Sequence, residues 1–465
     1  MIESRRLPLV AAVVLAIVTL KGFDPPIESG DPRLTYYLGA DGDDAADGRT
    51  PATAWRTLDR VTRRPLAPGE RVLLRGGDVF TGTLRLGAAD AGDERRPVWI
   101  GSYGSGRATI DGSTEAGVLV QDTGGVRIGD LTVVGAGGAA DGVAVYTDRP
   151  GTRPSGIVIE DLEVSGFRNG VSIGTTRHDA GYHAVTVRRV TAHGNTAAGV
   201  TTYGPEFDAA APVYANTDVT VSQVAAFGNT GDPAATVNTG SGIVLGSVSS
   251  GRISGSVAYG NGARAVAGQY GIWTYDSTQV VIEHNVSHHN RTGGVAGGGF
   301  DLDQNTSYCV LQHNLSYSND GPGFLLFSAA ANRANFGNVV RFNASVDDGR
   351  RGGRYGGITI LGGLAGPASA TGVFDAEVHG NTVTMGGSAA HTPPALRIAG
   401  TLGGVVVHDN VLTARDDAPL LLAQDFTVDG IALWANTFHS RRPVIDWSDR
   451  RFTTTADWIA ATGQS

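Results

Sequence analysis

Two aspartates stand two residues apart in the stretch GGGFDLDQNTSYC, residues 297 to 309: Asp301 and Asp303. Two carboxyl groups beside one bond can act as general acid and general base, which is what cleavage of a glycosidic bond requires. Residues i and i+2 of a strand lie about 6.7 Å apart, nearer the carboxyl spacing of inverting than of retaining glycosidases. A close pair also raises the pKa of one carboxyl, as a general acid needs.

The neighbouring segments predict which way this pair points. GIWTYDS (271–277), GFDLDQN (299–305) and GFLLFSA (323–329) align on a shared glycine, and side chains alternate along a strand. This register sends Ile272, Phe300 and Phe324 inward together with Thr274, Leu302 and Leu326. The opposite, outward face then carries Trp273, Tyr275, Asp301, Asp303, Leu325 and Phe327. We therefore expect an exposed acidic pair beside aromatic rings, on which the C–H faces of a sugar can stack.

Other side chains could join this site. Asp276 ends the preceding strand and is a third candidate catalytic carboxyl, while Trp273, Tyr275 and Phe327 are candidates for substrate binding. His288 and His289 lie in a predicted turn beside the cleft and could bind a hydroxyl or transfer a proton.

Two alternatives concern charge. Arg350 and Arg354, in the loop DDGRRGGRYGG, could bind the carboxylates of an acidic glycan, or the loop could simply be solvated. The pair Asp301 and Asp303 could instead bind calcium or be solvated surface residues. No set of metal ligands is predicted and no cofactor is required, with calcium as the alternative.

The elements that must position these residues form a repeat. From about Asp111 onward, short alternating strands recur, and asparagines follow at 285, 314, 343, 381, 410 and 436. A period of this length without helical patterns predicts a parallel β-helix of about eleven coils, in which stacked asparagines bond one another. The expected fold is all-β, a single-stranded right-handed parallel β-helix solenoid with a cap at each end.

The chain divides into four expected parts. Residues 1–30 are a signal peptide or anchor with a linker, because two arginines precede an apolar run from Leu7 to Leu20. Residues 31–110 are an N-terminal cap and the first coils, with a short helix from about Ala52 to Arg63. Residues 111–440 are the β-helix, and 441–465 are a C-terminal cap with a helix in TTTADWIAATG. We expect export to the cell surface or the medium.

Composition excludes some classes of function. The formal net charge of -9 argues against nucleic acid as a partner. Lys21 is the only lysine, so the coils offer no lysine base, and the single cysteine, Cys309, forms no intramolecular disulfide and is expected to be buried. Contact with a membrane is expected only through the possible N-terminal anchor.

The sequence resembles the right-handed parallel β-helix proteins of the pectate-lyase-like superfamily. The resemblance lies in YYLGADGDDAADGRTPATAWRTLDRV, PGERVLLRGGDVFTG and PVWIGSYGSGRATIDG, in the coils with their asparagines, and in TADWIAATG. It implies a polysaccharide or oligosaccharide substrate and outward aspartates on adjacent coils. Glycoside hydrolysis is the leading expectation. The alternatives are a polysaccharide lyase or uronate epimerase, and a noncatalytic glycan-binding or adhesion protein.

Overall fold

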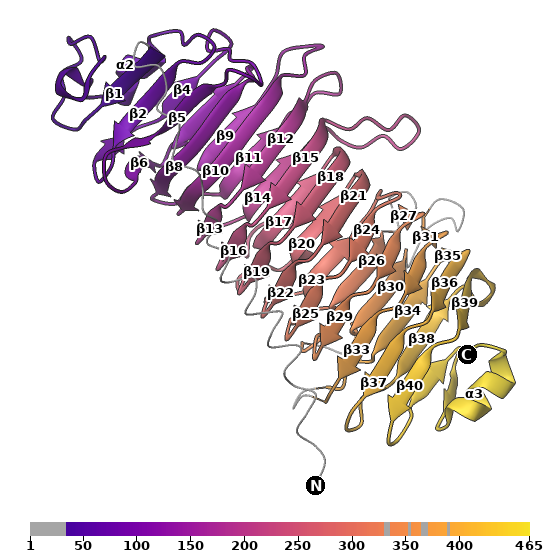
Figure 1. The fold of residues 1–465 in the computed structure, drawn as a ribbon. Coiled ribbons are helices and arrows are strands. Elements are labelled where there is room, and N and C mark those ends of the chain that lie inside the picture. The colour runs from indigo at the N-terminus through magenta and orange to yellow at the C-terminus, as the bar shows by residue number, and fades with distance from the viewer. Residues whose placement is uncertain (1–33, 330–334, 352–354, 364–370, 388–390) are drawn as a thin grey trace.

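The computed structural model describes residues 34–329, 335–351, 355–363, 371–387 and 391–465. The chain winds into a straight rod whose colour advances steadily from indigo at one end to yellow at the other (Figure 1). Segments far apart in the sequence therefore lie far apart in space, as in other repeat folds.

Each coil contributes strands to three faces of the rod. The first face is a sheet of β4 (Leu84–Leu86), β7 (Val118–Gln121), β9 (Val143–Tyr146), β11 (Asn169–Gly174), β14 (Ala198–Tyr203), β17 (Ser241–Gly246), β20 (Gln269–Tyr275), β23 (Ala296–Leu302), β26 (Phe324–Ser328), β30 (Ile358–Gly362), β34 (Leu396–Gly400), β38 (Leu421–Phe426), β41 (Ile445–Trp447) and β42 (Arg450–Phe452). We call this sheet the site face.

The other two faces are joined into one sheet, because β8 (Val126–Gly135) and β10 (Ser155–Ser165) run through both. The second face contains β1 (Thr35–Leu38), β2 (Arg71–Arg75), β5 (Val98–Tyr103), β12 (Tyr182–Arg188), β15 (Asn216–Ser222), β18 (Val248–Ser254), β21 (Thr278–Glu283), β24 (Val310–Gln312), β28 (Val339–Arg341), β32 (Glu377–His379), β36 (Val405–His408) and β39 (Ile431–Trp434). The third contains β3 (Val79–Thr81), β6 (Ala108–Ser113), β13 (Thr191–His193), β16 (Ala225–Phe227), β19 (Val257–Tyr259), β22 (Val286–His288), β25 (Leu315–Tyr317), β29 (Ala344–Val346), β33 (Thr382–Met385), β37 (Val411–Ala414) and β40 (Thr437–Ser440). A small extra sheet pairs β27 (Asn335–Phe336), β31 (Val373–Phe374) and β35 (Leu402–Gly403).

The strand pairing confirms the predicted parallel β-helix. Neighbouring coils pair in parallel throughout the site face until β41, on which β42 folds back antiparallel. Within residues 111–440 this face has eleven strands, β7 to β38, so the predicted number of coils is correct.

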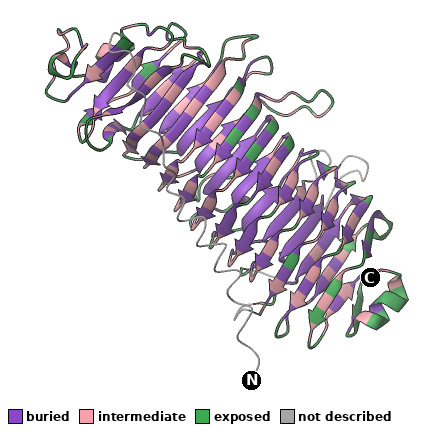
Figure 2. Cartoon of the chain, in the orientation of Figure 1, coloured by how far each residue is buried: buried purple, intermediate pink, exposed green. Residues whose placement is uncertain are grey.

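The interior of the rod is a continuous apolar column. Phe300 and Phe324 stack in it with ring centroids 5.1 Å apart, and Leu302 and Cys309 are fully buried there. Figure 2 shows the same division, with strands largely buried and most exposed residues in the turns and at the ends. These residues point inward as the alternation predicted.

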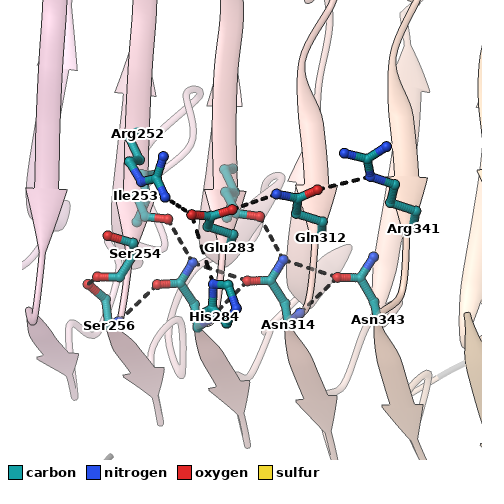
Figure 3. Close-up of polar contacts among 12 residues, drawn as sticks. Arg252, Ile253, Ser254, Ser256, Glu283, His284, Gln312, Asn314, Arg341 and Asn343 are labelled. Carbon is teal, nitrogen blue, oxygen red and sulfur yellow. Dashed lines mark hydrogen bonds and ion pairs between the residues drawn. The ribbon is translucent and has the colours of Figure 1, made fainter.

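A ladder of asparagines follows one inner corner of the coils, as the sequence predicted. The Asn314 side chain donates to Asn343 Oδ1 at 3.1 Å and accepts from Asn285, and the chain of bonds continues to Asn436 (Figure 3). A second ladder, which the interval pattern did not reveal, links Asn195, Asn229, Asn261, Asn290 and Asn319 to the buried Asp348. Both satisfy buried polar groups at the turns.

A row of polar side chains crosses the second face beside the first ladder. Glu283 is bonded by Arg252 on one side and by Gln312 Nε2 at 2.5 Å on the other, and Arg341 Nε donates to Gln312 Oε1 at 2.9 Å (Figure 3). This row uses charge to join four successive coils, so these polar residues have structural partners.

The N-terminal cap differs from the single helix expected over about 52–63. A 3-10 turn, η2 (Pro51–Thr53), and a short helix, α2 (Leu58–Thr62), are separated by Trp55, whose backbone bonds Tyr37 and Gly39. Pairing with the first strand therefore breaks the predicted helix. Leu58 and Val61 of α2 still cover the apolar end of the column.

The C-terminal cap contains the predicted helix, α3 (Thr455–Thr462). The Thr454 side chain accepts from the Asp457 N–H at its start, Gly463 ends it with φ 71°, and Trp458 is fully buried against the last coil. A 3-10 turn, η3 (Val428–Gly430), precedes β39.

The predicted signal peptide or anchor lies outside the described residues. In the part of the chain that is described, no helix is both long and apolar enough to cross a membrane.

Candidate active site

A cavity of about 850 Å³ lies over the outer side of the site face, and Asp301 and Asp303 both line it. Its floor comes from β11, β14, β17, β20, β23, β26 and β30. Val237, Asn238, Gly268 and Val295, from connections between coils, contribute to its lining. The cavity is therefore elongated along the rod.

The predicted register of the carboxyl pair is confirmed. Asp301 pairs with Trp273 on one neighbouring strand and with Leu325 on the other, while Phe300 faces the interior. The outward direction expected for the pair is therefore correct.

The predicted exposure of the pair is wrong. Asp301 is 1% exposed, Asp303 8% and Trp273 4%. Alternation along a strand decides which face a side chain takes, but it does not show what covers that face. Here neighbouring aromatic side chains and the connections between coils enclose the outward residues.

Aromatic rings adjoin the pair on the preceding strand. The ring centroids of Trp273 and Tyr275 lie 5.2 Å apart, and Tyr270 lies 6.5 Å from Trp273. The Trp273 indole N–H donates to Ser241 Oγ at 3.1 Å, which fixes the ring against the floor. Together with Leu325, Leu361 and Phe327 these side chains form an apolar cluster outside the main core. The floor thus offers flat apolar surfaces beside two carboxyls.

The three glycines before Asp301 allow this packing. A side chain at Gly298 would lie 2.3 Å from the Tyr270 ring, and one at Gly299 would lie 2.2 Å from Ser316 Oγ. Gly297 adopts a φ of +81°, which L residues disfavour. The register between β20 and β23 shifts at this point. The sequence GGG therefore brings the two strands and the Tyr270 ring together just ahead of the carboxyl pair.

Burial sets the ionisation of the pair. It raises the pKa of Asp301 well above the ordinary value, and the Asp303 carboxyl raises it further. Burial also raises the pKa of Asp303 to about 7, although the Gln304 N–H, which donates to Asp303 Oδ1 at 2.7 Å, opposes the shift. Asp301 Oδ1 is buried without a hydrogen-bond partner among the described residues. Burial thus favours the protonated form of Asp301, which is the form that a proton donor needs.

Asp276 lies near the pair but does not line the cavity. Its Oδ1 accepts from the Asn305 side chain at 2.6 Å, and burial raises the pKa of Asp276 to about 6 despite that bond. Its charge raises the pKa of Asp303 in turn. The structure therefore couples Asp276 to the site through Asp303.

His288 and His289 lie away from the cavity, so their expected position beside the cleft is wrong. His288 ends β22 on the third face, where its ring stacks between Tyr259 and Tyr317 at centroid distances of 5.1 and 4.6 Å. His193 and Phe227 extend the same stack toward the N-terminal end. Because the ring faces contact one another, we interpret this row of stacked rings as a structural feature of the third face.

Some of the remaining predicted binding residues line the cavity and others do not. Phe327 and Tyr275 line the cavity with Trp273. Arg350 is exposed and does not line it, although Tyr355, from the same loop, does. Arg354 lies outside the described residues.

Calcium at the pair stays an untested alternative. That ion takes six to eight oxygen ligands, and the two strand partners of Asp301, which are Trp273 and Leu325, offer no side-chain oxygen.

Elsewhere in the described chain, Glu377, His379 and His408 bring possible metal ligands within 4.8 Å of one another. The imidazole rings of His379 and His408 stack with 2° between their planes, so their nitrogen lone pairs point in parallel and do not converge on one ion. Both ring nitrogens of His408 already bond carboxylates, those of Glu377 and Asp409.

The polar end of the cavity was not predicted. Asp141, Arg168, Asn169 and Tyr203 line it, several coils before the carboxyl pair. Asp141 and Arg168 stand in connections between coils, in AADG and GFRNG, where the strand register carries no information. No spacing in the sequence points to their meeting.

This geometry defines a class of protein: a parallel β-helix that encloses a carboxyl pair on one outer face. A family profile described as right handed beta helix region matches residues 106–338 and 213–383, more than half of the chain. The chain therefore belongs to the right-handed β-helix family. No curated protein matches it by sequence.

Solved structures show the same fold. The lacto-N-biosidase of family GH136 from Eubacterium ramulus is 18% identical with a TM-score of 0.61, over 87% of this chain and 68% of that one. The A-module of the mannuronan C-5 epimerase AlgE4 from Azotobacter vinelandii is also 18% identical with a TM-score of 0.53, over 80% and 91%. At these identities the likeness concerns the fold alone.

Proposed function

We propose that the protein is an exported carbohydrate-active enzyme, a glycoside hydrolase that cleaves a glycan in the cavity of the site face. The observation that carries the proposal is the buried pair: Asp301, with an unpartnered oxygen in a cavity wall, lies beside Asp303 and against Trp273. Two carboxyls with raised pKa values beside an aromatic surface match the needs of glycosidic hydrolysis. The glycosidase and epimerase among the similar folds make a glycan substrate a reasonable choice.

In this mechanism the two carboxyls have different tasks. Asp301, whose pKa is raised well above its ordinary value by burial, protonates the leaving oxygen of the glycosidic bond. Asp303, whose pKa is about 7, takes a proton from the attacking water when it is ionised. The neighbouring Asp276 adjusts the charge of Asp303. Trp273 holds the sugar ring across the pair.

The test is a cleavage screen with product analysis. The wild-type chain, Asp301→Asn and Asp303→Asn are incubated with neutral and acidic glycans, and Asp208→Asn on an exposed loop is the matched control. We expect the two site variants to lose at least a thousandfold in kcat/KM while Asp208→Asn keeps wild-type activity. The rate of the wild type should rise as pH passes about 7, where Asp303 loses its proton, and fall again where Asp301 does.

The other outcomes separate the remaining classes of function. Unsaturated products that absorb in the near ultraviolet would identify the reaction as elimination instead of hydrolysis. Inversion of a uronate centre without chain cleavage would identify it as epimerisation. Binding without turnover across the panel would make the protein a glycan-binding module. Full activity of both site variants would remove the carboxyl pair from the mechanism.

A further inference from the structure

The cavity extends mostly to one side of the carboxyl pair. On its C-terminal side the described lining comes from two strands, β26 and β30, through Leu325, Phe327 and Leu361, and from Tyr355 in the loop before β30. On its N-terminal side β20, β17, β14 and β11 follow one another along the rod (Figure 1). Strands stacked about 4.8 Å apart make the four steps from β23 to β11 roughly 19 Å long. That distance is enough for several sugar residues in a row.

The lining changes character along this length. Next to the carboxyl pair it is apolar, with Trp273 and Val244 on the floor and the exposed Val237 and Val295 contributed by loops. At the far end it becomes polar, where Asp141, Arg168 and Tyr203 replace the apolar side chains.

The polar end is held in place by its own contacts. Asp141 Oδ1 accepts from the backbone and side-chain N–H groups of Asn169 at 3.1 and 2.8 Å, and Asp141 Oδ2 accepts from Ser172 Oγ at 2.6 Å. Asn169 is 6% exposed, so this support is itself a buried part of the cavity lining. Arg168 is exposed, and within the described residues its guanidinium has no hydrogen-bond or ion-pair partner. One fixed acceptor and one free donor thus line this end of the cavity.

The charges of the cavity bear on the class of ligand. Among the described residues that line the cavity, Arg168 is the only cationic one, and Asp141, Asp301 and Asp303 are carboxyl groups. A uronan would bring a carboxylate with each sugar, and these would face Asp141 and the ionised form of Asp303, with one guanidinium among the described lining residues to neutralise them. Neutral sugars offer only hydroxyls, to which Asp141 can accept and Arg168 can donate.

We propose that the cavity binds a neutral oligosaccharide lengthwise, with several sugars on the N-terminal side of the carboxyl pair and a terminal subsite formed by Asp141 and Arg168. This inference rests on the proposed function, since it treats the cavity as the glycan site, and it adds the substrate class and the direction of binding. Asp141 and Arg168 act as binding residues for a sugar that is remote from the reacting bond.

Calorimetric binding to Asp301→Asn tests this, because the ligands survive in that variant. The probes are neutral oligosaccharides from disaccharide to hexasaccharide and oligogalacturonates of the same lengths. We expect neutral chains to bind tighter with length until the subsite is filled. Adding Arg168→Ala should weaken binding of the long chains about tenfold and leave the disaccharide unchanged, since one charge-assisted bond is lost. Arg95→Ala, which removes an exposed arginine outside the cavity, is the matched control.

Three results would overturn the inference: affinity independent of length, equal effects of Arg168→Ala on all lengths, or tighter binding of the oligogalacturonates. Asp141→Asn provides a second variant, and its thermal midpoint shows whether the fold survives the loss of the Asn169 and Ser172 bonds. Length-dependent binding without turnover by the wild type would sink the hydrolase proposal and keep the subsite. Turnover by the wild type, with binding that does not depend on chain length, would keep the hydrolase proposal and remove the subsite.

Discussion

The buried Asp303 carboxyl should make the fold less stable as pH rises. Its pKa is about 7 in the folded chain against an ordinary value of 3.8, so the folded state holds this proton more tightly than the unfolded state. The stabilisation is fully present below the unfolded pKa of about 4 and is lost as pH rises through about 7. A difference of about three pKa units corresponds to about 4 kcal/mol.

Asp303→Asn removes this titration. We expect the free energy of unfolding of the wild type to fall by about 4 kcal/mol more than that of the variant between pH 4 and pH 8. Urea denaturation followed by circular dichroism at several pH values measures the difference, and Asp208→Asn should run parallel to the wild type. Asp301, Asp276 and Asp348, whose pKa values are also raised by burial, leave a residual slope in the variant. Parallel curves for Asp303→Asn and the wild type would refute the reasoning.

Three further perturbations test other parts of the molecule. Asn314→Ala removes a buried side chain that bonds Asn343, Asn285 and the Ile282 carbonyl, and should cost about 2–4 kcal/mol in urea denaturation; a loss below about 0.5 kcal/mol would contradict a stabilising ladder. Trp273→Ala should weaken glycan binding to Asp301→Asn at least tenfold by calorimetry, whereas Ser241→Ala, which removes the indole partner and one hydroxyl of the cavity lining but keeps the ring, should weaken it less. Cys309 should resist a thiol reagent until the chain unfolds, because burial raises the pKa of its thiol to about 12; rapid labelling of the native protein would show that the column opens.

The repeat made most of the fold predictable. Each coil places an asparagine at one corner and alternating apolar residues on each strand, so the same prediction is supported many times over. The inward direction of Phe300 and the outward direction of Asp301 follow from that alternation. The break in the first helix could not be read in this way, because Trp55 is drawn into pairing with a strand that occurs once.

The site was less predictable because it depends on what lies between the coils. Connections of irregular length carry Val237, Val295, Asp141 and Arg168 into the cavity, and no period relates them. For His288, by contrast, the sequence did contain a pattern that predicts its structural position. The copies ending in HGN, FGN, YGN, HHN and YSN place one ring at the same point of each coil, and a row of rings at constant spacing indicates stacking.

The enclosure of the carboxyl pair carries a cost that the surrounding coils must offset. Ionising Asp303 opposes folding by about 4 kcal/mol at high pH, a large part of the usual stability of a domain. The pair lies in the interior of the rod's length, where each neighbouring coil adds buried apolar residues and asparagine bonds on both sides. A coil at either end has a neighbour on one side only. The same two carboxyls in an end coil would therefore open that coil more readily, and water would enter and return their pKa values toward 4. A raised pKa for a proton donor thus requires a position that is supported from both directions, and β23 has such a position.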